Sequence, residues 1–316
     1  MGLFSKKDPC AICGGKVKGF LPWKIDGKYI CDNCYGTVDL PDGAVNNMTV
    51  EDFKRYRAFR EENQKLRDGF KTDRSIDFGF WDTKFVFDFA HHLMCLDPKL
   101  NKTIFEGKQI RSFTIMEDMT PLFEGDANGL RRYTSTVPER VRALEPQITQ
   151  FMMEEERRRN LRDLHEAIHG KDDDRDHDFD RVQFFNAPEP FKEFVVEIRF
   201  DHPYWGSFKA DMNGPSFDSS YPSTADYLNK YRESADIMEQ LAKALMAIAF
   251  PGKPEIPVDA NGRAAAPAAP AQAAPAPAAA PAVDAVSEIQ RYKALLDQGI
   301  ITEEEFAAKK KQLLGI

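Results

Sequence analysis

The sequence predicts a multidomain α+β protein, and three observations support this fold class. Four of the five cysteines lie in two C-x-x-C pairs near the N-terminus. The middle of the chain alternates apolar and polar residues with the period of β-strands and ends in a long helical pattern. An alanine- and proline-rich stretch then separates a short C-terminal segment from the rest. With 316 residues, about twice the usual ~150 per domain, the chain has room for several folding units.

The cysteine pairs predict a metal site. The four candidate ligands are Cys10, Cys13, Cys31 and Cys34. The pairs can converge on one ion, because a turn at Asp26-Gly27 predicts a hairpin between them. A disulfide framework needs an oxidising compartment, and a redox C-x-x-C needs a single pair beside a βαβ unit. We therefore predict one structural Zn²⁺ ion in an N-terminal four-cysteine zinc ribbon over residues 1–45, with no coordination position left open for catalysis.

Residues 49–69 predict a connecting helix, with Thr49 placed to cap it and Asp52 in its first turn. An antiparallel β domain is predicted over residues 70–250. Alternating phenylalanines predict a hairpin around residues 81–84, and further strands are predicted at residues 93–96, 104–105, 110–116, 194–201 and 206–212. Cys95 lies in an apolar run and is expected to be buried.

A long closing helix over residues 224–250 completes the predicted β domain, because its apolar residues form one broad face. Antiparallel strands followed by such a helix are typical of pleckstrin-homology-like domains, a fold that does not fix a function. Aromatic residues gather at residues 202–206 and 217–222, where we expect core and turn packing.

A charged insertion over residues 138–181 interrupts the strands. Its glutamate, arginine and aspartate runs predict a solvated helix and an acidic loop. The insertion also contains His165-Glu-Ala-Ile-His169, which matches the H-E-x-x-H pattern of zinc hydrolases, with Glu166 as the general base. Charged residues on both sides of the motif disfavour the dry pocket that this chemistry needs. A zinc metallohydrolase is therefore the alternative function, and a polar surface helix is the favoured interpretation.

Composition weighs against several other functions. The 51 acidic side chains outnumber the 43 basic ones, which disfavours nucleic-acid binding. A further alternative keeps nucleic-acid binding local to the zinc ribbon, through Lys16, Lys18, Lys24 and Lys28. No phosphate-loop, dinucleotide or serine-hydrolase motif occurs. No apolar stretch of ~18 residues and no signal peptide is evident, so we expect a cytoplasmic protein with no transmembrane segment.

The C-terminal part predicts a tether and a hairpin. Residues 251–285 predict a disordered Ala/Pro linker, because the recurring prolines prevent a continuous helix. Residues 286–316 predict a C-terminal two-helix hairpin, in which Gly299 ends the first helix and Thr302 starts the second. Two short helices bury too little surface to be stable alone, so we expect the hairpin to self-associate or to dock on a partner.

Two stretches resemble known families. The tail, with Leu-Leu-Asp-Gln-Gly-Ile-Ile-Thr-Glu-Glu-Glu-Phe306, resembles the SHOCT (short C-terminal) domain, which implies oligomerisation or partner binding. The two C-x-x-C pairs with Lys28-Tyr-Ile-Cys31, together with Ile110-Arg-Ser-Phe-Thr-Ile-Met-Glu-Asp118, resemble a bacterial zinc-ribbon family of unknown function that often carries such a tail. That family implies no established activity, and here the charged insertion replaces its usual glycine-rich stretch.

These features together predict a non-enzymatic, zinc-binding adaptor or scaffold protein. It is expected to work through protein partners and to form a homo-oligomer through its C-terminal hairpin. Separate weak modules on one tether gain affinity by avidity, which is the physical advantage of this layout.

Overall fold

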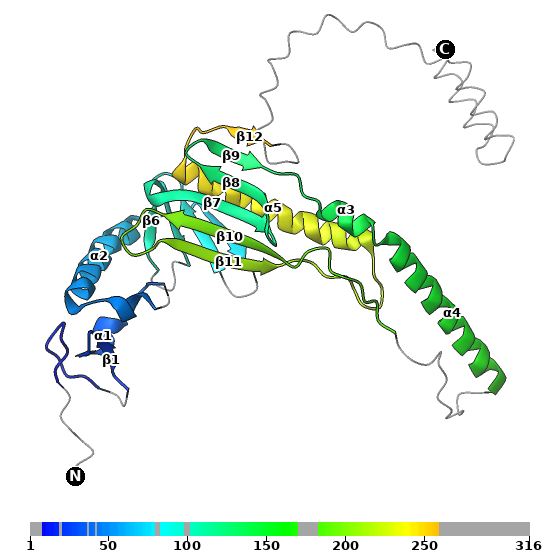
Figure 1. Cartoon of the computed structure of the whole chain (residues 1–316), viewed down its shortest axis with the longest axis horizontal. Helices are drawn as coiled ribbons and strands as arrows, with labels where there is room; N and C mark the ends of the chain where they lie inside the picture. Colours follow the sequence, from blue (N-terminus) through cyan, green and yellow to red (C-terminus); the bar gives the residue numbers. More distant parts are fainter. Residues whose placement is uncertain are drawn as a thin grey trace, which may run out of the picture. The chain divides into compact units, whose positions relative to one another are not determined.

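The fold is described from a computed structural model of the chain (Figure 1). The structure describes residues 8–18, 21–36, 38–41, 43–79, 83–97, 102–169 and 183–258. These residues belong to one compact unit, Met1–Ala265. The predicted acidic loop beyond residue 169, most of the predicted linker and the predicted C-terminal hairpin lie outside the described residues.

The N-terminal module consists of short elements followed by one long helix. They are the antiparallel strands β1 (Trp23–Ile25) and β2 (Lys28–Ile30), helix α1 (Asp32–Tyr35), the 3-10 helix η1 (Ala44–Asn47) and helix α2 (Val50–Gly69). The predicted cap of α2 is confirmed, because the hydroxyl of Thr49 accepts from the N–H of Asp52 at 3.1 Å and the Asp52 carboxylate accepts from the N–H of Thr49 at 3.0 Å. Phe53 and Tyr56 of α2 are fully buried against the strands. The first half of α2 therefore completes the core of this module.

A four-stranded antiparallel sheet follows. Its strands are neighbours in chain order: β3 (Arg74–Phe78), β4 (Thr83–Asp88), β5 (Leu93–Leu96) and β6 (Ile104–Glu106). Both faces of this sheet are covered, which makes β4 and β5 nearly continuous apolar runs. Phe85 and Phe87 belong to the main core, whereas Val86 and Cys95 pack on the opposite face with Leu66 of α2. The predicted burial of Cys95 is thus confirmed.

A six-stranded sheet forms the second layer, in the order β11-β10-β7-β8-β9-β12. Its strands are β7 (Ile110–Glu117), β8 (Thr120–Asp126), β9 (Gly129–Arg132), β10 (Glu193–Phe200), β11 (Ser207–Asn213) and β12 (Glu255–Pro257). β7, β10 and β11 lie close to their predicted positions, whereas β8, β9 and β12 were not predicted. β12 pairs in parallel with β9, so regular structure extends into the segment predicted as linker.

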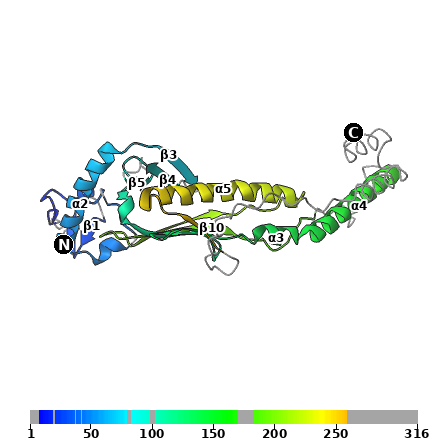
Figure 2. The ribbon, with the colours of Figure 1, turned by 90° about the horizontal axis from the view of Figure 1, so that it is seen from above.

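Helix α5 (Thr224–Ala249) lies between the two sheets (Figure 2). Its bounds match the predicted closing helix, and its buried residues include Met238, Leu241 and Leu245. The short 3-10 helix η3 (Gly107–Gln109) approaches the end of α5 closely. A Cβ atom at Gly107 would lie 2.0 Å from the carbonyl oxygen of Ile248, so only glycine fits there.

Two helices connect β9 to β10. Helix α3 (Val137–Arg142) buries Val137 and Val141 and packs on α5. Helix α4 (Glu145–His169) continues away from the sheets (Figures 1 and 2) and forms the helical part of the predicted insertion. In the part of the chain that the structure describes, no helix combines the length and apolarity needed to cross a membrane.

Candidate metal centre

The first cysteine pair lies in a tight loop. The N–H of Gly14 donates to the carbonyl of Cys10 at 2.8 Å, and the N–H of Cys10 donates to the carbonyl of Gly15 at 2.8 Å. Gly14 has a φ of +69°, which glycine adopts without steric cost. The N–H of Ala11 also donates to the carbonyl of Tyr29 at 2.9 Å, so the loop is held against β2.

The second cysteine pair lies at the start of α1. Cys31 precedes the helix and Cys34 lies within it. The predicted turn between β1 and β2 is present, because Asp26 and Gly27 both have positive φ values, 51° and 72°. This turn reverses the chain, and β2 leads directly into Cys31.

The four sulfur atoms come together as the spacing predicted. All lie within 4.8 Å of one another, and the Sγ atoms of Cys13 and Cys31 are 3.6 Å apart. In a tetrahedral site with Zn–S bonds of ~2.3 Å, two sulfurs are separated by about 3.8 Å, so these residues fit a zinc ion. Among the described residues, no other group of three or more potential ligands lies close enough to hold an ion. Four thiolates fill a tetrahedral sphere, which leaves no position for water or substrate.

Hydrogen-bond donors surround the sulfurs. The N–H of Cys31 donates to Sγ of Cys10 at 3.3 Å, and the guanidinium of Arg57 on α2 donates to Sγ of Cys34 at 3.4 Å. Burial opposes ionisation of Cys10, but backbone N–H groups from its own loop and from Cys31 outweigh it and lower its pKa to about 6. Burial, together with the neighbouring cysteines, raises the pKa of Cys34. Arg57 was not predicted, because one arginine among the many charged residues of α2 forms no recognisable pattern.

A buried polar network joins this module to the small sheet. Asp39 is 7% exposed and accepts from the N–H and the hydroxyl of Thr103, at 2.6 and 2.7 Å. Arg60 on α2 donates to the Thr103 hydroxyl at 3.0 Å. The phenol oxygen of Tyr56 accepts from the N–H of Asp39 at 2.6 Å. The loop before η1, the middle of α2 and the start of β6 are therefore held in one arrangement.

Asn63 extends this junction along α2. Its amide donates to the carbonyl of Ile104 at 2.7 Å and accepts from the N–H of Ile104 at 2.9 Å. Ile104 lies in β6, an edge strand of the small sheet. Asn63 therefore bonds both backbone groups in the way that a neighbouring strand would.

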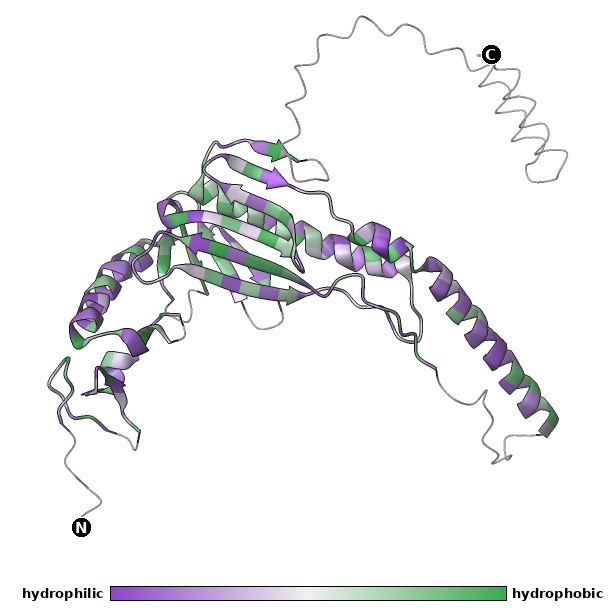
Figure 3. Cartoon of the chain, viewed as in Figure 1, coloured by the Kyte–Doolittle hydropathy of each residue, from purple (hydrophilic) through white to green (hydrophobic). Residues whose placement is uncertain are grey.

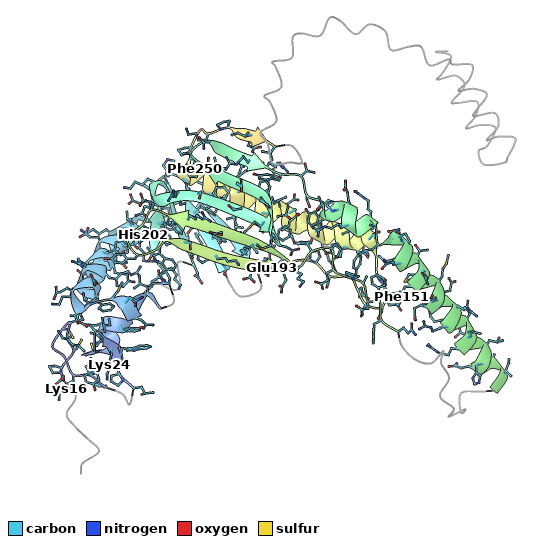
Figure 4. All side chains as sticks on the ribbon, viewed as in Figure 1. Lys16, Lys24, Phe151, Glu193, His202 and Phe250 are labelled. Atoms are coloured by element: carbon cyan, nitrogen blue, oxygen red, sulfur yellow. The ribbon has the colours of Figure 1, made fainter. Side chains whose placement is uncertain are left out.

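The aromatic cluster at residues 202–206 packs at the same junction, as predicted for it. The ring of His202, which is labelled in Figure 4, meets Phe59 of α2 edge-on, with centroids 5.1 Å apart, and lies 5.5 Å from the ring centroid of Phe105 in β6. Nδ1 of His202 accepts from the N–H groups of Tyr204 and Trp205, at 3.1 and 3.2 Å. Burial lowers the pKa of His202, and an unprotonated Nδ1 is the form that these two donors require.

The lysines of the nucleic-acid hypothesis lie on the surface of the module; they are Lys16, Lys18, Lys24 and Lys28 (Lys16 and Lys24 are labelled in Figure 4). Nζ of Lys24 lies 4.9 Å from the ring centroid of Tyr29. Nearby, Trp23 is 48% exposed and stacks on Tyr35 with centroids 3.8 Å apart. The module thus presents an exposed aromatic pair beside basic residues.

The H-E-x-x-H residues lie near the C-terminal end of α4. His165 is half-buried and Glu166 is exposed, whereas the side chain of His169 lies outside the described residues. Leu164, just before the motif, and Ile168, within it, are 57% and 64% exposed. Among the described residues, none forms around this stretch of α4 the apolar enclosure that dry metal chemistry needs.

Comparison with protein-family models gives two matches, which confirm the two predicted resemblances. Residues 9–56 match a domain of unknown function (DUF4428), and residues 287–314 match the SHOCT model, a short C-terminal domain. The first match contains all four clustered cysteines and ends within α2. No curated protein and no solved structure matches the chain.

Proposed function

We propose that this protein is a non-enzymatic, zinc-stabilised adaptor that presents its N-terminal module and β domain to protein partners as one piece. The closed four-sulfur geometry carries the proposal, because an ion held there orders a surface and has no position for a substrate. The network from Asp39 to Thr103 supports it, because it links the metal-binding module to the sheet. The β domain is proposed to be pleckstrin-homology-like, with α5 as its closing helix.

The proposed ion is Zn²⁺ and the proposed compartment is the cytoplasm. Four soft thiolates at tetrahedral spacing favour zinc over harder cations. None of the five cysteines forms a disulfide, which suits a reducing compartment. A partner would meet exposed side chains on the module, including Leu21, 87% exposed, and Trp23.

The SHOCT domain is proposed to hold several copies together. Joining copies raises the effective concentration of each weak binding surface, so partner binding strengthens without new contacts. The test compares the full-length chain with a chain ending at Ala265, the limit of the compact first unit. The full-length chain should sediment as an oligomer and capture its partners more tightly. If both chains form assemblies with the same number of copies and capture the same partners equally well, the tail does not have this role.

Metal content tests the non-enzymatic part of the proposal. Elemental analysis of the full-length protein should give about one zinc per chain, bound by the cysteines. A second metal equivalent that disappears in the His165→Ala, His169→Ala double variant would instead support the metallohydrolase. In that case the adaptor proposal would fail even if the tail oligomerises.

A further inference from the structure

Helix α4 carries an uncovered apolar face. Its residues recur at steps of three or four, and we call them the α4 seam: Pro146, Gln150, Met153, Arg157, Leu161, Leu164 and Ile168. Every seam residue is exposed. Met153 and Ile168 expose 66% and 64% of their surface, so the described residues leave the seam open from one end to the other. In Figure 3, green hydrophobic segments alternate with purple hydrophilic ones along α4.

The opposite face of α4 packs against other parts of its own domain. Ile148 is buried, and the ring of Phe151 meets the ring of Phe185 with centroids 5.5 Å apart. Arg158 donates to the side-chain oxygen of Gln183, which lies outside α4, at 2.5 Å. Since these contacts fix which side of α4 faces its own domain, the seam faces away from that domain.

The seam has the length of a helix-docking surface. From Pro146 to Ile168 it spans about 33 Å at a rise of 1.5 Å per residue. Steps of three and four residues are those that let side chains of two helices interlock.

The charged residues around the centre of the seam indicate what binds to it. Arg157 lies in the middle of the seam, which is otherwise uncharged, and Glu154 and Glu156 flank it. A purely apolar partner would remove Arg157 from water and supply no carboxylate of its own in return, which is costly. A second copy of α4 supplies both a matching apolar stripe and the carboxylates of its own Glu154 and Glu156.

We propose that α4 pairs with α4 of a second copy of this chain, antiparallel, about a two-fold axis at Arg157. The steps along the seam are the same from either end, so reversal aligns every seam position with a seam position. Met153 then meets Leu161 of the second copy, and each Arg157 lies among glutamates of both chains. This arrangement also keeps the two β domains at opposite ends of the pair. Such a contact is isologous, as expected of a closed dimer.

The test uses photo-cross-linking in the full-length protein. A benzophenone side chain replaces Leu164, and unlabelled protein is mixed with ¹⁵N-labelled protein so that links between chains are distinguished from links within one. The expected product joins position 164 to the region of Gln150 in the other chain. The chain ending at Ala265 should give the same product, because this pairing does not rest on the proposed role of the tail.

Charge reversal supplies the matched variants. Arg157→Glu makes positions 154, 156 and 157 all acidic, and the Glu154→Arg, Glu156→Arg double variant makes them all basic. Each variant alone should lower the yield of the cross-link between two chains by about tenfold, equivalent to ~1.4 kcal/mol. Mixing the two variants should restore the yield, because the all-acidic helix then meets the all-basic one. Arg159→Glu is the control, since Arg159 is exposed but lies outside the seam.

Several outcomes would overturn the pairing. A cross-link from position 164 that stays within one chain, or that joins it to the C-terminal segment, to a different protein, or to the other α4 in a parallel register, contradicts the proposal. So does a yield of the cross-link between chains that charge reversal leaves unchanged, or that mixing the two variants fails to restore. All the substituted side chains are exposed, so unchanged circular dichroism should accompany each variant. Loss of oligomer mass in the chain ending at Ala265, with the α4 link retained, would separate this contact from the one proposed for the tail.

Discussion

The two hydrogen bonds between the Asn63 side chain and the backbone of Ile104 in β6 give a quantitative prediction for stability. In Asn63→Ala, the N–H and the carbonyl of Ile104 lose their partners while Ile104 remains 1% exposed. A buried backbone group left without a partner costs about 1–3 kcal/mol, so two such groups cost about 2–6 kcal/mol. Alanine returns roughly 0.5 kcal/mol through its better helix propensity. We therefore expect the free energy of unfolding to fall by about 1.5–5.5 kcal/mol.

The neighbouring residue provides the control for this prediction. Gln64 also donates a side-chain hydrogen bond, to Asp68 at 2.7 Å, but that bond is exposed. Gln64→Ala should change stability by less than ~0.5 kcal/mol. Urea unfolding of both variants, with hydrogen exchange at the Ile104 amide, measures the difference. If the two variants lose the same stability, or if the Ile104 amide stays protected from hydrogen exchange in Asn63→Ala, the Asn63 side chain does not stabilise the edge strand.

Three further perturbations test the metal centre, the core and the junction. Cys31→Ser should bring the metal content from about one ion per chain to near zero, whereas Cys95→Ala should keep the ion, as elemental analysis would show. Gly107→Ala forces its Cβ into the end of α5 and should cost about 1–3 kcal/mol in urea unfolding, whereas Gly206→Ala, with open space around it, should be tolerated. His202 has a lowered pKa in the folded state, so the unfolded chain takes up a proton first. Stability should be level above about pH 6.5 and fall as the pH drops from there towards the lowered pKa, and His202→Asn should remove that slope, which calorimetry at several pH values would reveal.

Periodic features were predictable from the sequence, because regular structure repeats its burial pattern. The bounds of α2 and α5 follow from a cap and from apolar spacing, and β5 from a short apolar run. The convergence of the four sulfurs follows from the two pairs and from the turn at Asp26. In each case a local residue pattern is sufficient, and no distant contact is needed.

The missed strands show where local patterns fail. In β8, Leu122 and Phe123 are buried side by side, because the pairing register shifts between Ile115 and Met116 of β7. Two adjacent buried residues break the alternation by which a strand is recognised. β12 is three residues long and is held by pairing with β9, which lies far away in the sequence. Its own sequence carries too little periodic signal to indicate a strand.

The junction between the metal-binding module and the sheet was not predicted from the sequence, for a different reason. The face of α2 that makes it uses polar side chains at helical spacing, Tyr56, Arg60 and Asn63, each of which bonds a group outside α2. Tyr56 belongs to the apolar pattern that predicts the helix, but a periodicity analysis assigns polar residues such as Arg60 and Asn63 to the solvent-facing side, although here they lie on the side that contacts the sheet. On the same helix Arg57 reaches the Cys34 sulfur, so one rigid element touches both the metal site and the edge of β6. Arg57 and Asn63 lie six residues apart, less than two helical turns, so the same part of α2 packs against the metal site and against the edge strand. An ion that orders the cysteines would therefore also order the part of α2 that bonds the sheet.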